Sequence, residues 1–282
     1  MRVAGLMNLA NSLSALRRVA SDSCAFRRLG LPPLWYLRVY YEGRWCSRRS
    51  RPAPEHIIEL NYRGRQMRFP VTAGYVGALN GIFLDDEYCV AEALGSAPKR
   101  ILDLGANIGM AAAALAAQYP DAEFVFVEPD PRNLERLRKT IAWNDLRGTV
   151  FSSAVAAQPG NLLLRIGEDP TCSALETSRM HDLPDSVEVE VRTVNELLQQ
   201  MRWHDVDLVK IDIEGTEEEL LTRNNNWLSR VGSLILEIHP SCSPIRIGRA
   251  LGDFGLDLRQ HGNGREPMFI ATRSPNCSYH RE

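Results

Sequence analysis

Residues 101–109 read Ile-Leu-Asp-Leu-Gly-Ala-Asn-Ile-Gly, and this stretch decides the fold. A short apolar run carries an acid and then enters a turn that contains two glycines. Residues 110–115 follow as methionine, four alanines and leucine, which are strong helix formers. The segment therefore predicts a strand, a tight loop and a helix. Such a corner holds a nucleotide-like cofactor at the carboxyl end of a parallel strand.

The glycine spacing excludes two common nucleotide sites. A dinucleotide-binding turn needs Gly-x-Gly-x-x-Gly, whereas Asn107 and Met110 occupy the second and third glycine positions counted from Gly105. A phosphate-binding P-loop needs Gly-Lys followed by Ser or Thr, which this turn lacks. The pattern present is Asp-x-Gly-x-x-x-Gly, formed by Asp103, Gly105 and Gly109. It resembles the first motif of class I S-adenosylmethionine-dependent methyltransferases.

A second acid follows the next predicted strand. Residues 123–128 read Glu-Phe-Val-Phe-Val-Glu, so Glu128 ends a compact apolar run. A carboxylate in this place can accept both ribose hydroxyls of a nucleoside, as the acid of a Rossmann unit does. The alternative for Glu128 is a solvated acid at a strand end. Its separation from the glycine turn favours the ribose role.

Two further runs carry a resemblance to one family. Residues 209–217 read Val-Lys-Ile-Asp-Ile-Glu-Gly-Thr-Glu, and residues 234–240 read Leu-Ile-Leu-Glu-Ile-His-Pro. Together with the glycine turn and Val-Glu-Pro-Asp at 127–130, they resemble the FkbM-type methyltransferases over roughly residues 75–272. One departure is visible, because Ala156-Ala157 stands where this family often has Gly-Asp, which puts a polar adenine contact from these positions in doubt.

The resemblance implies S-adenosyl-L-methionine as the cofactor. A carboxylate at Asp103 would favour its cationic amino-acid end, directly or through water. The residues expected to bind the cofactor are Asp103, Gly105, Ala106, Asn107, Gly109, Glu128, Ala154 and Asp212.

Three residues near the predicted fourth and fifth strand ends are candidates for catalysis. Asp212 is assigned to cofactor and acceptor positioning, Glu214 to a second positioning role, and His239 to a base, because the ordinary pKa of histidine suits such work near neutrality. Glu214 could instead be an acid favoured by a helix N-terminus, and His239 a hydrogen-bonded strand-end residue. Two carboxylates alone are weak evidence for a cation, so no metal is predicted.

The order of apolar runs predicts an α/β fold. We expect a Rossmann-like, mostly parallel seven-stranded sheet with helices on both faces and a C-terminal antiparallel hairpin. The central strands are expected at 100–104, 124–127, 150–154, 206–211 and 233–238, and the helices at 108–118, 131–143, 217–223 and 245–254. Residues 256–260 and 267–272 form the predicted hairpin.

Two appendages flank or interrupt this domain. Residues 1–55 form a basic, partly helical arm and linker, and residues 56–282 form the methyltransferase domain. Leu6, Leu9, Leu13 and Leu16 recur at helical spacing, so the arm could pack on the domain, lie on a membrane surface or serve as a transit peptide. Residues 156–205 are an insertion whose strand-like segments are a candidate substrate cover; the alternative is a hairpin without substrate contact.

Charge is unevenly distributed along the chain. The 282 residues have a net charge of −2. Ten arginines and two acids up to Arg51 give +8, so the remainder carries about −10. An RNA methyltransferase would be expected to have a basic catalytic surface, so no nucleic-acid partner is expected. The six cysteines show no paired or zinc-binding spacing.

The resemblance to FkbM-type methyltransferases implies an O-methyltransferase acting on a hydroxyl of a sugar, glycolipid or natural product. The Asn/Asp-Pro-Pro-Tyr/Phe signature of many amino methyltransferases is absent near Asp212, where the sequence is Asp-Ile-Glu-Gly. The alternatives are an N- or protein methyltransferase, and a catalytically inactive cofactor-binding interaction module. We expect a cytoplasmic protein, with peripheral membrane contact through the arm as an alternative. The oligomeric state does not follow from the sequence.

Overall fold

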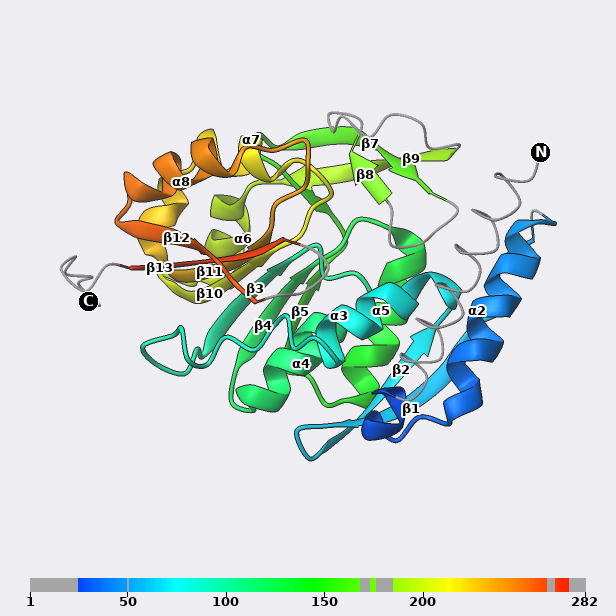
Figure 1. The fold of residues 1–282 in the computed structure, drawn as a ribbon. Helices are drawn as coiled ribbons and strands as arrows, with labels where there is room; N and C mark the ends of the chain where they lie inside the picture. Colours follow the sequence, from blue (N-terminus) through cyan, green and yellow to red (C-terminus); the bar gives the residue numbers. More distant parts are fainter. Residues whose placement is uncertain (1–24, 50, 168–172, 176–184, 263–266, 274–282) are drawn as a thin grey trace, which may run out of the picture.

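The computed structural model describes residues 25–49, 51–167, 173–175, 185–262 and 267–273. A seven-stranded sheet forms its centre (Figure 1). In spatial order the strands are β12 (Leu256–Gln260), β13 (Met268–Arg273), β11 (Val231–Glu237), β10 (Val206–Ile211), β3 (Arg100–Leu104), β4 (Glu123–Val127) and β5 (Gly148–Phe151).

The five strands from β11 to β5 are parallel, and β13 is antiparallel to both of its neighbours. The predicted sheet and its C-terminal hairpin are therefore confirmed. Parallel neighbours place their carboxyl ends at one edge, so the chain leaving β3, β4 and β10 meets there. This edge is where the candidate site residues of the sequence collect.

Helices cover both faces of the sheet (Figure 1). One face packs against α3 (Val76–Phe83), α4 (Met110–Gln118) and α5 (Pro131–Trp143), and the other against α6 (Val194–Met201), α7 (Glu217–Thr222) and α8 (Pro244–Gly252). Alternate residues of each strand pack against the two helical layers, because successive side chains point to opposite faces of the sheet. Ile101 joins the α3–α5 side and Leu102 the α6–α8 side.

The helix that follows β4 begins at a well-defined cap. Asp130 accepts a hydrogen bond from the backbone N–H of Arg132 at 2.8 Å, and Pro131 occupies the first helical position. Proline is favoured there because its missing N–H would have no partner within the helix. The start of α5 is thus fixed immediately after the second acid of the sequence pattern.

A separate four-stranded sheet lies beside the main one. It contains β6 (Ala154–Val155), β9 (Asp185–Arg192), β7 (Gly160–Ile166) and β8 (Ser173–Leu175), in this spatial order. The prediction of one strand over 150–154 is wrong, because the main-sheet strand ends at Phe151 and Ala154 pairs with Val191 of β9 instead. The long antiparallel pair β7–β9 corresponds to the strand-like segments expected in the insertion.

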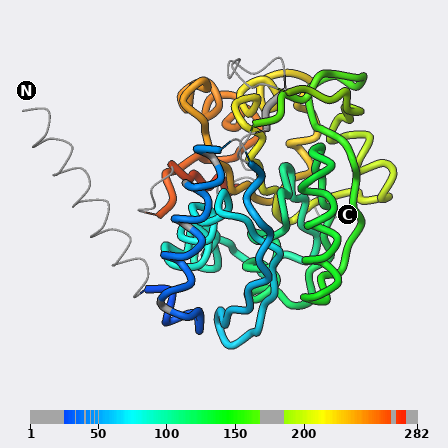
Figure 2. The backbone as a smooth tube through the Cα atoms, turned by 90° about the vertical axis from the view of Figure 1, so that its right-hand side faces the viewer, coloured from blue at the N-terminus to red at the C-terminus, as the bar shows by residue number. Residues whose placement is uncertain are grey.

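The N-terminal elements lie together at one end of the α3–α5 layer (Figures 1 and 2). They are the 3₁₀ turn η1 (Arg27–Leu29), α2 (Pro33–Ser47), the hairpin β1 (His56–Tyr62) and β2 (Arg65–Val71), and the 3₁₀ turn η2 (Ala73–Tyr75); a third such turn, η3 (Asn226–Arg230), precedes β11. Phe26 and Val39 are buried in the same core as the hairpin. The leucine repeat from Leu6 to Leu16 lies outside the described residues. No helix in the described part of the chain is long and apolar enough to cross a bilayer.

Truncation of Phe26 tests whether residues 25–49 are integral to this core. Phe26 is fully buried and its ring centroid lies 5.3 Å from that of Tyr36. We expect Phe26→Ala to lower the free energy of unfolding by about 3–5 kcal/mol in urea denaturation. Leu34→Ala, at a position that is 72% exposed, should change it by about 0.5 kcal/mol or less. Equal effects of the two substitutions would contradict a shared core.

Candidate active site

The glycine turn after β3 has the backbone shape that its sequence requires. Gly105, Asn107 and Gly109 have φ angles of 76°, 52° and 85°. A Cβ atom on Gly105 would lie 1.8 Å from the carbonyl oxygen of Asp212, so the loops after β3 and β10 approach too closely for any side chain. Gly109 instead allows close packing on α5, because its Cβ would lie 2.9 Å from Leu137 Cδ1.

Glu128 holds the turn from the neighbouring strand. One carboxylate oxygen accepts the N–H of Asn107 at 2.8 Å, and the other accepts the N–H of Asp130 at 2.9 Å. The side chain is almost completely buried. Burial raises the pKa of Glu128 to about 7, although these two N–H groups lower it. Glu128 also lines the pocket described below, so it both holds the turn and borders the pocket.

Asp103 lies beneath the turn rather than on its surface. Its carboxylate is fully buried and lies 3.2 Å from Lys210 Nζ on the adjacent strand β10. Burial lowers the pKa of the Lys210 ammonium, but the charges of Asp103 and Asp212 outweigh burial and raise it. Asp103 does not line the pocket, so its contact with the cofactor, directly or through water, stays a prediction.

Lys210 is a residue that the sequence reasoning missed. Its ammonium donates to the carbonyl oxygen of Gly105 at 2.5 Å and lies 3.7 Å from Asp212 Oδ2. A lysine within an apolar strand that is buried on both faces was the available signal, since such a residue must be paired. Lys210 thus contacts both the loop after β3 and the loop after β10, beneath the pocket that they form.

One pocket opens where these loops meet. It is lined by residues of the turn, acids at the strand ends and three residues of the small sheet. Its lining residues are Gly105, Asn107, Val127, Glu128, Pro129, Asn133, Ser153, Ala154, Val155, Leu164, Asp212, Ile213, Glu214 and Thr216.

Six predicted residues thus share this pocket: Gly105, Asn107, Glu128, Ala154, Asp212 and Glu214. The other four predicted residues, Asp103, Ala106, Gly109 and His239, do not line it. Ala106 is buried in the core and donates its N–H to Val127 at 2.9 Å. Leu164 comes from β7, so the insertion contributes to the wall of the pocket.

Ser153 is a second residue that the sequence reasoning missed. It lines the pocket between β5 and β6, and its hydroxyl has no hydrogen-bond partner among the described residues although it is buried. A buried hydroxyl without a partner is costly, so this group is available for a ligand.

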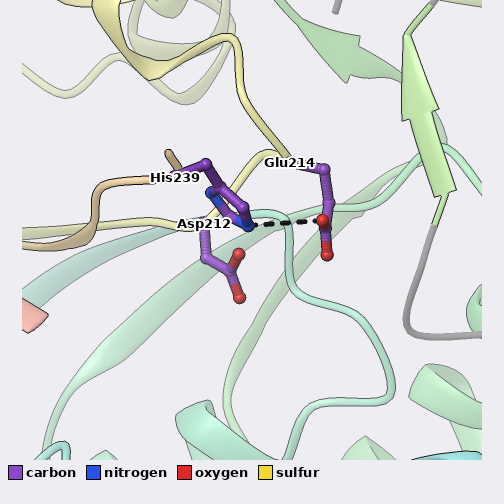
Figure 3. Close-up of side chains that lie close together, drawn as sticks. All are labelled: Asp212, Glu214 and His239. Carbon is purple, nitrogen blue, oxygen red and sulfur yellow. Dashed lines mark ion pairs between the residues drawn. The ribbon is translucent and has the colours of Figure 1, made fainter. Parts of the chain in front are cut away.

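His239 lies within a group of carboxylates (Figure 3). Its Nδ1 is 2.9 Å from Glu217 Oε1, and its Nε2 is 3.3 Å from Glu214 Oε2 and 3.5 Å from Glu237 Oε1. Burial lowers the pKa of the imidazole, but the bonds to Glu214 and Glu217 outweigh it and raise the pKa to about 11. Both ring nitrogens thus contact carboxylates, and the assignment of His239 as a base stays a prediction.

Glu217, rather than Glu214, is the acid in the N-terminal turn of the helix that follows β10. Glu217 is fully buried in the first turn of α7 and accepts the N–H of Gly215 at 3.0 Å. Glu214 has a φ of 55° and its side chain faces the pocket. Because Glu214 has a positive φ and is followed by a glycine, its side chain is directed away from the helix and toward the pocket.

The sequence that forms this site matches a known protein family. The profile described as "Methyltransferase FkbM domain" matches residues 103–247, just over half of the chain. The "Ribosomal RNA small subunit methyltransferase C" of Haemophilus influenzae is 29% identical over 106 residues, which cover 37% of this chain. The matched part spans only 28% of the length of that relative.

Two relatives match over more of their length. The "Hexuronic acid methyltransferase AglP" of Haloferax volcanii is 25% identical over 62% of this chain and 70% of its own. The "31-O-demethyl-FK506 methyltransferase FkbM" of Streptomyces tacrolimicus is 22% identical over 61% of this chain and 76% of its own.

The close approach at Gly105 can be measured by substitution. Gly105→Ala introduces both a positive-φ alanine and an overlap with the Asp212 carbonyl, so we expect a loss of at least about 4 kcal/mol of unfolding free energy. Gly64→Ala is the matched control, because Gly64 has a φ of 80° and open space at its Cβ. It should cost only about 1–2 kcal/mol. Similar losses at the two positions in chemical denaturation would contradict the close approach.

Proposed function

The chain belongs to the FkbM family of S-adenosylmethionine-dependent methyltransferases, and we propose that it transfers a methyl group to a hydroxyl of a sugar, glycolipid or natural product. The observation that carries this proposal is the pocket in which Gly105, Glu128, Asp212 and Glu214 meet. The edge formed by the carboxyl ends of parallel strands is where such folds bind nucleotide cofactors.

The residues of the pocket fit S-adenosylmethionine. Glu128 offers carboxylate oxygens to ribose hydroxyls. The hydroxyl of Ser153 has no hydrogen-bond partner within the described part of the chain and is available to the nucleoside. Gly105 and Asn107 bring backbone close to the ligand space, which suits the amino-acid end of the cofactor. When bound, the cofactor supplies an electrophilic methyl group on a positively charged sulfur.

The chain's own residues would prepare the acceptor. A hydroxyl is a weak nucleophile, so it must be aligned with the methyl carbon and shielded from water. Asp212 and Glu214 face the pocket and can accept a hydrogen bond from such a hydroxyl. Leu164 and the small sheet that carries it would exclude water from the same space.

Several features favour an oxygen acceptor. Residues 212–215 read Asp-Ile-Glu-Gly, unlike the proline-rich signature of many amino methyltransferases. The names of two relatives refer to a hexuronic acid and to a 31-O-demethyl compound. An RNA acceptor is the second candidate, because another relative is named as a ribosomal RNA methyltransferase. The acidic balance of the chain after Arg51 disfavours it.

The pKa of Glu128 predicts how cofactor binding depends on pH. Ribose hydroxyls donate to the ionised carboxylate, and the group becomes protonated as the pH falls through about 7. We therefore expect affinity for S-adenosylhomocysteine to fall below pH 7 by up to about tenfold per unit in calorimetry. Glu128→Gln should bind more weakly and show no such dependence. A wild-type affinity that stays constant from pH 8 to pH 5.5, while the chain remains folded, would contradict the ribose role.

Radiolabelled methyl transfer tests the acceptor class. The purified chain is incubated with methyl-labelled S-adenosylmethionine and hexose glycosides, hexuronic acid glycosides, a glycolipid, a hydroxylated macrolide or a ribosomal RNA fragment. We expect an alkali-stable methyl ether on a hydroxylated acceptor and at least a hundredfold lower turnover in Asp212→Asn. An alkali-labile methyl ester, or labelled RNA, would overturn the hydroxyl assignment. Cofactor binding without transfer to any acceptor would favour the interaction-module alternative.

A further inference from the structure

Three side chains with metal-ligand chemistry converge on the acceptor side of the pocket. Asp212 and Glu214 follow β10, and His239 follows β11 (Figure 3). One potential ligand atom from each lies within 4.8 Å of the others. The separation between His239 Nε2 and Glu214 Oε2 is 3.3 Å. Two ligands at right angles around a cation, each about 2.2 Å from it, are about 3.1 Å apart.

The imidazole is held in the orientation that a ligand requires. Its Nδ1 lies 2.9 Å from a carboxylate oxygen of Glu217, which also accepts the N–H of Gly215 at 3.0 Å. The second oxygen of Glu217 accepts from Cys242 Sγ at 3.1 Å. Metal-binding histidines usually donate their second ring nitrogen to such a fixed carboxylate. The ring therefore directs Nε2 toward Glu214 and Asp212.

The charge balance around this point is negative. The contacts of the cluster join five carboxylates, those of Asp103, Asp212, Glu214, Glu217 and Glu237, to two nitrogen groups. These groups are the ammonium of Lys210 and the imidazole of His239. Partly buried carboxylates in excess are stabilised by an additional cation.

From this geometry we propose that Asp212, Glu214 and His239 bind one divalent cation of the Mg²⁺ and Mn²⁺ class. Two carboxylates and one imidazole are oxygen-rich ligands that suit a hard cation. The sequence alone offered only two carboxylates two residues apart. The third ligand and its orienting acid become visible only in the fold.

The catalytic role of the cation rests on the proposed methyl transfer. A cation at this position binds the acceptor oxygen and lowers the pKa of its hydroxyl. In the transfer the oxygen–carbon bond forms, the carbon–sulfur bond breaks with its electron pair going to sulfur, and the hydroxyl proton leaves to water. Neighbouring hydroxyls of a sugar suit a cation with open coordination positions.

Manganese binding tests the site without any acceptor. Electron paramagnetic resonance of the full chain with Mn²⁺ alone should show one bound ion, with nitrogen modulation from the imidazole in spin-echo spectra. We expect Glu214→Gln to weaken binding at least tenfold, and His239→Gln to abolish the nitrogen modulation. Glu217→Gln should weaken binding about 10- to 100-fold through loss of ring orientation. Glu219→Gln is the matched control, because Glu219 lies on α7 and pairs with Arg223 at 3.3 Å.

Each outcome bears on either the cation or the function. Absence of bound Mn²⁺ at millimolar concentration, unchanged affinity in Glu214→Gln, or binding of Zn²⁺ alone would overturn the proposed cation site. S-adenosylhomocysteine binding and thermal melting are measured for each variant without metal, which establishes that the variants are folded. A chain that binds S-adenosylhomocysteine but no Mn²⁺ refutes only the cation. A chain that binds Mn²⁺ but not S-adenosylhomocysteine refutes only the methyltransferase function.

Discussion

The buried ammonium of Lys210 is the group on which the pocket depends. It joins Asp103 on β3 to the loop that follows β10, and it donates to the carbonyl oxygen of Gly105. A buried charge is costly unless it is paired, so Lys210 and Asp103 require each other. Because both side chains point to the same face from adjacent parallel strands, their pairing fixes the relative position of two loops before any ligand arrives.

The need for glycine at position 105 follows from the same constraint. Once the two strand ends are held together, the Asp212 carbonyl occupies the space that a side chain at Gly105 would need. Glu128 then secures the far side of the turn through the N–H of Asn107. The acid and the glycine of the sequence motif therefore act partly through packing and ion pairing beneath the pocket. Gly105 and Asn107 of the turn and the Glu128 side of the site line the pocket itself.

Much of the sheet could be predicted from the sequence. The bounds of β3, β10 and α5 agree with the expected ranges, because short apolar runs between turn residues and a Pro-capped helix are local signals. The split at Phe151 was missed, because Ala154 pairs with β9 across an insertion of about thirty residues. Periodicity along one segment does not report which distant strand will pair with it.

The candidate site shows a similar division between local and distant information. Glu128 and Asp212 were identified because each ends a strand, whereas Lys210 and Ser153 were missed because their importance depends on neighbours from other strands. His239 was recognised as an ionisable group, but its charge state is decided by Glu214, Glu217 and Glu237. Residue type thus indicates the available chemistry, and the surrounding charges decide which part of it can be used.

The two sides of the pocket differ in the number of charged groups that they contain. The side of the pocket next to the turn is lined by Gly105, Asn107 and one buried acid, Glu128. The His239 side concentrates carboxylates and keeps Asp212 and Glu214 partly exposed, with 26% and 23% of their side chains accessible. Burying charged groups costs free energy, and apolar residues of similar volume would often stabilise the fold equally well. The polar acceptor proposed above would give these carboxylates hydrogen-bond donors.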